Sequence, residues 1–113
     1  MVYEHAHLLA AEMKESEEYR AYCAVKERAF VNETTRNLIA EYHKLQVKLQ
    51  AGALTGEKND ALLQQAQKLG EVLQFDANAA EFLMAEYRIR TMLGDIYKIL
   101  AEAIDIDLSA LEA

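Results

Sequence analysis

The amino-acid sequence predicts an all-α protein, built as antiparallel helical hairpins or a bundle of about five helices with a long C-terminal helix. Three observations support this fold class. The chain of 113 residues contains no proline and only four glycines, so few positions interrupt a helix. Apolar residues recur at alternating steps of three and four, which is the period of an amphipathic helix. Small polar residues that suit N-caps separate the apolar runs.

The first two helices are expected over residues 2–14 and 17–30. The apolar seam of the first helix consists of Val2, Ala6, Leu9 and Met13. Ser16 is expected to be the N-cap of the second helix, because its hydroxyl can accept a hydrogen bond from the first turn. The inward face of that helix is expected to contain Tyr19, Tyr22, Cys23, Val25, Ala29 and Phe30. Cys23 is therefore predicted to be buried and structural.

The middle of the chain predicts a helical hairpin. Asn32 is expected to cap a helix over residues 33–51, and Gly52 is expected to end it. The apolar seam of this helix is Leu38, Tyr42, Leu45 and Leu49. Thr55 is expected to cap the next helix. The apolar seam of that helix is Leu62, Ala66, Leu69 and Leu73.

The last helix is expected over residues 77–104, with Asp76 as its N-cap. Its length of about 28 residues corresponds to about 42 Å. A compact domain of this size has a radius of gyration near 13 Å and thus a diameter of about 34 Å. The helix is therefore longer than such a domain. Beyond it, Leu108 and Leu111 are expected to form a packed C-terminal cap.

Two overlapping apolar stripes run along this last helix. They consist of Ile89, Leu93, Ile96 and Leu100, and of Met92, Ile96, Ile99 and Ala103. One stripe is enough to cover the helices of the same chain, so the second is expected to contact another subunit. Gly94 supports this expectation, because a glycine inside a helix costs about 1 kcal/mol unless a close approach of another helix compensates. The chain is therefore expected to be a homo-oligomer, most simply a dimer, with an interface at Met92, Leu93, Ile96, Ile99 and Leu100.

A short block is repeated, as LIAEY from Leu38 and as LMAEY from Leu83. The repeat supplies two Glu-Tyr pairs, which are Glu41 with Tyr42 and Glu86 with Tyr87. Each tyrosine follows a seam leucine by four residues, so both rings are expected to pack at the edge of the core, with the glutamates facing solvent. The alternative is that these pairs contact a partner, because tyrosine offers both a ring and a hydroxyl.

The composition excludes several classes of protein. The net charge is −7, and the 12 Lys and Arg residues are scattered among 19 acids, so direct nucleic-acid binding is not expected. No run of eighteen apolar residues occurs, so no membrane insertion is expected. The N-terminus has no pattern of a secretory signal, which together with a single cysteine favours a cytoplasmic protein. One helical domain over residues 1–113 is expected.

No catalytic, cofactor-binding or metal-binding residue is predicted. His5 and His7 point about 200° apart on a helix and cannot share a metal. A di-iron bundle needs Glu-x-x-His motifs on two helices, and neither Glu41 nor Glu86 has a histidine three residues later. Phosphate-binding loops and nucleophile motifs are also missing from the sequence, so an enzyme is not expected. The alternative is a ligand-binding protein or enzyme with a site between subunits. That site would use Glu41, Glu86, Tyr42, Tyr87 or His43.

Three segments together resemble the YlbF/YmcA family of Gram-positive bacteria over nearly the whole chain. They read VYEHAHLLAAEMKESEEYRAY, FVNETTRNLIAEYHKLQVKLQ and FDANAAEFLMAEYRIRTMLGDIYKILAEAI. Within them, KESEEY begins at Lys14, KLQVKLQ at Lys44 and ILAEAI at Ile99. The resemblance implies a YheA/YmcA-like helical fold that associates with itself.

The same resemblance implies a regulator without catalytic residues. It implies protein partners in competence, sporulation and biofilm control, and in RNase Y dependent mRNA processing. Some members of the family carry iron–sulfur clusters in a three-protein complex. This chain departs from those members, because Cys23 alone cannot supply the four thiolates that a cluster usually takes.

Overall fold

The protein folds into helices joined by short turns. The computed structural model describes residues 1–56 and 59–105. The helices are α1 (Val2–Lys14), α2 (Glu17–Val31), α3 (Glu33–Thr55), α4 (Asp60–Gln74) and α5 (Ala77–Ile104). No strand occurs within these described residues, and the predicted all-α class is confirmed. The expected C-terminal cap at Leu108 and Leu111 lies outside the described residues.

Three of the predicted N-caps are confirmed by their hydrogen bonds. The Ser16 hydroxyl accepts from the backbone N–H of Tyr19 at 3.2 Å. The side-chain oxygen of Asn32 likewise accepts from an N–H in the first turn of α3. Asp76 accepts from two N–H groups at the start of α5. Each cap satisfies donors that a helix leaves free in its first turn.

The predicted boundary between α3 and α4 is wrong by several residues. Helix α3 continues through Gly52 to Thr55 and is capped by Gly56, whose φ of 79° lies in the left-handed region. A glycine inside a helix costs about 1 kcal/mol, and the following residues are compatible with a helix, so Gly52 does not stop it. Thr55 donates its hydroxyl back to the carbonyls of Ala51 and Gly52. Asn59, and not Thr55, caps α4.

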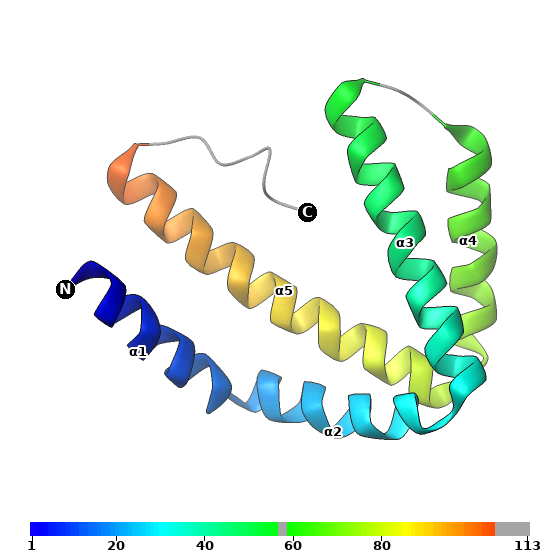
Figure 1. Ribbon diagram of the computed structural model, residues 1–113, viewed down its shortest axis with the longest axis horizontal. Coiled ribbons are helices and arrows are strands. Elements are labelled where there is room, and N and C mark those ends of the chain that lie inside the picture. The colour runs from blue at the N-terminus through cyan, green and yellow to red at the C-terminus, as the bar shows by residue number, and fades with distance from the viewer. Residues whose placement is uncertain (57–58, 106–113) are drawn as a thin grey trace.

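The helices form an open V with two arms (Figure 1). In one arm α5 runs antiparallel to α2, and in the other α3 and α4 form a hairpin. The extents are 44 × 37 × 15 Å, and the radius of gyration is 16.4 Å. Because a helix with its side chains is about 10–12 Å across, the V is a single layer of helices. The radius of gyration is larger than the value of about 13 Å for a compact domain of the same length.

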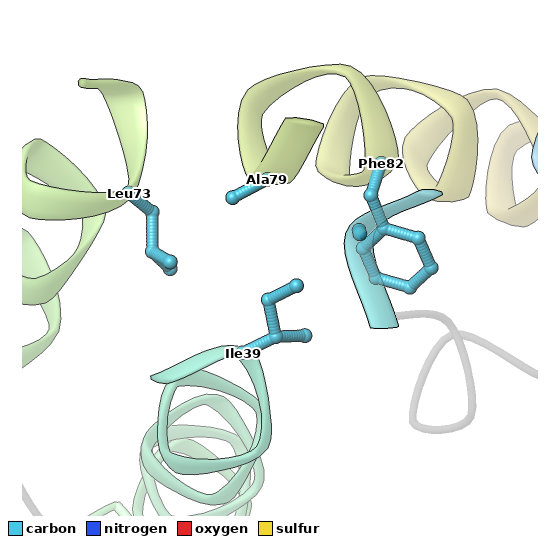
Figure 2. Close-up of a cluster of buried hydrophobic side chains, with 5 residues drawn as sticks. Ile39, Leu73, Ala79 and Phe82 are labelled. Carbon is cyan, nitrogen blue, oxygen red and sulfur yellow. The ribbon is translucent and has the colours of Figure 1, made fainter. Parts of the chain in front are cut away.

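The buried core lies at the vertex of the V, where four helices meet. Figure 2 shows Ile39, Leu73, Ala79 and Phe82 pointing toward one another from α3, α4 and α5. Ala29 of α2 completes this cluster. No residue of α1 is buried, so the packing that holds the fold together is concentrated at the vertex and becomes sparse along the arms.

Candidate interaction surface

The C-terminal half of α5 carries apolar side chains that the rest of the described chain does not cover. Ile99, Leu100 and Ile104 are 65%, 52% and 64% exposed. Met92, Leu93 and Ile96 are half-buried. The five residues predicted as an interface therefore divide into two uncovered side chains, Ile99 and Leu100, and three that are partly covered. We call this half of α5 the apolar strip.

Helix α1 adds further apolar surface to the same arm. Figure 1 shows α1 continuing the line of α2 along the C-terminal half of α5. Val2 and Leu8 are exposed, while Leu9 and Met13 are half-buried. The seam predicted for α1 is thus only partly covered within the described chain, and the free ends of α1 and α5 expose apolar surface in the same region.

Gly94, near the start of the apolar strip, faces open space. Apart from its chain neighbours and the adjacent backbone of α5, a Cβ atom placed there would meet no atom of the described chain within 4 Å. A glycine at a close contact between helices is instead Gly70 on α4. A Cβ atom placed at Gly70 would lie 3.6 Å from the ring of Tyr42 on α3. Contact of Gly94 with a second subunit stays a prediction.

The two copies of the repeated block adopt different orientations. Tyr42 is half-buried and packs against the core cluster, as predicted. Tyr87 is 67% exposed, so the packing predicted for it is wrong. Glu41 faces solvent as expected. The same prediction is wrong for Glu86, whose side chain is only 14% exposed. The copies differ because α3 turns its tyrosine face toward α4, while α5 turns the face of Phe82 and Glu86 toward the inside of the V.

Glu86 and His43 form a polar contact between the two arms. His43 Nε2 lies 2.9 Å from Glu86 Oε1, so the imidazole N–H donates to the carboxylate. Arg90 lies 3.6 Å from the same oxygen. The structure therefore brings together two of the five residues named for a site between subunits. In the described ranges, no three His, Cys, Asp or Glu side chains are placed to hold a metal ion.

Cys23 is exposed, so the prediction that it is buried is wrong. The covered face of α2 is formed by Tyr22, Val25 and Ala29. Residue 23 is about 100° from residue 22 around the helix, which places it outside the buried stripe. The Cys23 thiol instead lies near Tyr19. It raises the pKa of the Tyr19 hydroxyl, mainly through a hydrogen bond and to a lesser extent through its charge.

Asp76 connects the starts of α3 and α5. Its Oδ2 accepts a hydrogen bond from the Thr35 hydroxyl at 2.6 Å, while its Oδ1 caps α5. These hydrogen bonds hold the pKa of the Asp76 carboxyl below its ordinary value. The bond from Thr35 has the largest effect, followed by the bond from the Ala79 N–H. Periodicity reveals apolar faces but not cross-helix pairs, so the sequence identified Asp76 as a cap and did not identify Thr35 as its partner.

Comparison with known proteins gives consistent matches over nearly the whole chain. A family model described as control of competence regulator ComK, YlbF/YmcA, matches residues 2–105. A UPF0342 protein of Symbiobacterium thermophilum is 42% identical over 112 residues, which cover 95% of this chain and 96% of the relative. A UPF0342 protein of Halothermothrix orenii is 30% identical, covering 96% of this chain and 92% of the relative.

A solved structure has the same fold. It is a protein of unknown function (DUF964) from Bacillus stearothermophilus, with a TM-score of 0.72 and 18% sequence identity. The match covers 92% of each chain. Among the helices in residues 1–56 and 59–105, none is both long enough and apolar enough to cross a bilayer.

Proposed function

Because this chain belongs to the YlbF/YmcA family, described as controlling the competence regulator ComK, we propose that it is a non-enzymatic regulatory protein that acts through contacts with other proteins. The observation that carries this proposal is the apolar surface left uncovered by a fold one helix thick. Ile99, Leu100 and Ile104 each keep more than half of their surface in solvent. A protein partner that covers them would gain about 1–2 kcal/mol for each side chain.

The first partner in this proposal is a second copy of the chain. The apolar strip of α5 serves as the contact, centred on Met92, Leu93, Ile96, Ile99 and Leu100. Monomeric soluble proteins rarely expose contiguous apolar patches larger than a few hundred Å². Self-association would cover such a surface without requiring another gene product, and two-fold dimers are the commonest symmetric assembly.

Regulation requires further partners, which we propose to be regulatory or RNA-processing proteins in the cytoplasm, including those of RNase Y dependent mRNA processing. The charge of the chain favours protein contacts over direct RNA contact. With a net charge of −7, phosphate groups are repelled at long range. A link to RNA processing would therefore pass through a protein partner.

Affinity capture from a native lysate tests this function. The tagged chain is expected to enrich a small set of regulatory or RNA-processing proteins over the bare tag, and RNase treatment is expected to leave that set unchanged. Loss of every captured protein after RNase treatment would mean that RNA mediates the contacts. Failure to enrich any protein over the bare tag would also count against the proposal.

The second candidate is a ligand-binding protein or enzyme with a site between subunits. It is favoured by one observation, the half-buried pair of His43 and Glu86. A histidine beside a carboxylate is a common arrangement for proton transfer or ligand contact. Native mass spectrometry and elemental analysis of the purified protein separate the two functions. The regulator is expected to carry no stoichiometric small molecule or metal, and a ligand retained after chelation and dialysis would favour the second candidate.

A further inference from the structure

The contact between His43 and Glu86 lies where the two arms of the V separate. Ile39, one helical turn before His43, and Phe82, one turn before Glu86, both belong to the vertex core. The imidazole of His43 still lies near the ring of Phe82, with centroids 6.3 Å apart. The polar contact is therefore the first layer outside the apolar core, at the fork between α3 and α5.

The apolar contacts between the arms are concentrated in the vertex core. The most extensive helix packing joins α2 to α5 and α3 to α4, which is packing within each arm. The ion pair between Arg28 and Glu81, at 2.8 Å, also lies within one arm. Across the arms, the side-chain hydrogen bonds of the described chain are Thr35 with Asp76 at the vertex and His43 with Glu86 farther out. The second is thus the outermost polar connection between the arms.

We propose that the His43–Glu86 contact is a latch that sets the angle between the two arms. Its partners suit a reversible contact. The His43 side chain is 31% exposed and that of Glu86 is 14% exposed, so opening the arms would replace the bond with hydrogen bonds to water. Arg90, near the same carboxylate oxygen, would keep Glu86 paired in the open state. The proposal does not depend on the regulatory function.

Because the latch lies close to the vertex, a small change in the angle there would move the free ends of the arms by a larger distance. The distance along α3 from His43 to its end at Thr55 is about 18 Å. A change of about 10° at the fork would move that end by about 3 Å. A small change at the latch would therefore alter the relative positions of surfaces on α3 and α5 that lie far from it.

Pulsed electron paramagnetic resonance measures this angle directly. Spin labels are attached at Lys48→Cys on α3 and Lys98→Cys on α5, both exposed positions, in a Cys23→Ser background. The labelled protein is diluted with excess unlabelled protein, so that only distances within one chain are recorded. The latched protein is expected to give one narrow distance distribution.

Glu86→Ala removes the acceptor and is expected to shift the distribution by about 3 Å or more, or to broaden it by that amount. Glu81→Ala is the matched control, because it makes the same substitution on α5 but breaks a pair within one arm. It is expected to leave the distribution unchanged. If Glu86→Ala fails to fold by circular dichroism, His43→Leu removes the donor instead. A folded Glu86→Ala or His43→Leu protein with the wild-type distribution would overturn the proposal, as would an equal shift in Glu81→Ala.

Discussion

Asp76 has the most hydrogen-bond partners of the N-cap side chains, since it caps α5 and binds the Thr35 hydroxyl. Its lowered pKa means that the folded state favours the ionised carboxylate. The stabilisation is therefore fully present above the ordinary carboxyl pKa of about 3.9 and is lost as pH falls through the folded-state value. Acid should weaken the vertex, whereas neutral pH should not.

Two substitutions of Asp76 test its contribution to stability and to the acid sensitivity of the fold. Asp76→Ala is expected to lower the free energy of unfolding at pH 7 by about 1–2 kcal/mol, because a cap and a cross-helix hydrogen bond are lost. Asp76→Asn keeps an acceptor for the cap but has no titrating carboxyl. Urea unfolding between pH 5 and pH 3 should show a smaller loss of stability in Asp76→Asn than in wild type. Equal losses in the two proteins would assign the acid sensitivity to other groups.

The exposed thiol of Cys23 leads to a second residue-scale prediction. Because no core packing depends on this side chain, Cys23→Ser is expected to change the free energy of unfolding by less than about 0.5 kcal/mol. A maleimide reagent is expected to label the native thiol about as fast as the thiol in urea. Labelling that requires unfolding would indicate that the thiol is covered, for example by a second subunit.

The sequence predicted the role of a single residue correctly when its hydrogen-bond partner was close along the chain. Ser16, Asn32 and Asp76 were predictable as caps because their targets lie within three residues. Cys23 and Tyr87 were not predictable, because each lies close to an apolar seam and one position on a helix changes the direction of a side chain by about 100°. Only the packing of neighbouring helices decides which face is covered.

At the scale of the helices, the sequence predicted the bounds of α1 and α5 correctly and failed between α3 and α4. The failure followed from treating Gly52 as a stop signal when a second glycine lies four residues later. Gly56 ends α3 because a left-handed φ of 79° is strained for residues with a side chain. The repeated block was also predicted correctly as helical, but its two copies face different neighbours.

Gly94 offers a test of the apolar strip at the same scale. Because a Cβ there meets nothing in the described chain beyond its chain neighbours and the adjacent backbone of α5, Gly94→Ala is expected to stabilise an isolated chain by up to about 1 kcal/mol. If a second subunit approaches this glycine closely, the same substitution should weaken association. Thermal unfolding at several protein concentrations separates the effects. A gain in stability with unchanged association would place the subunit contact away from Gly94.

At the scale of the whole molecule, the sequence did not predict the open V. Apolar periodicity indicated which helix faces avoid water, but it does not say whether the same chain or another chain covers them. The length predicted for α5 exceeded the diameter of a compact domain, and the observed radius of gyration of 16.4 Å is also larger than the value of about 13 Å for such a domain. The sequence named His43 and Glu86 among the residues of a site between subunits, but it did not predict their contact within one chain, because the two residues lie on helices far apart in the chain.

Self-association through α5 is the central claim, and size-exclusion chromatography with light scattering tests it most directly. At low micromolar concentration, the wild-type protein is expected to have twice the mass of a single chain. Ile99→Glu places a charge in the apolar strip and is expected to give a folded monomer. Val47→Glu is the matched control, because Val47 on α3 is 64% exposed and Ile99 is 65% exposed, and it should keep the dimer mass. A folded, monodisperse wild-type monomer would contradict the account.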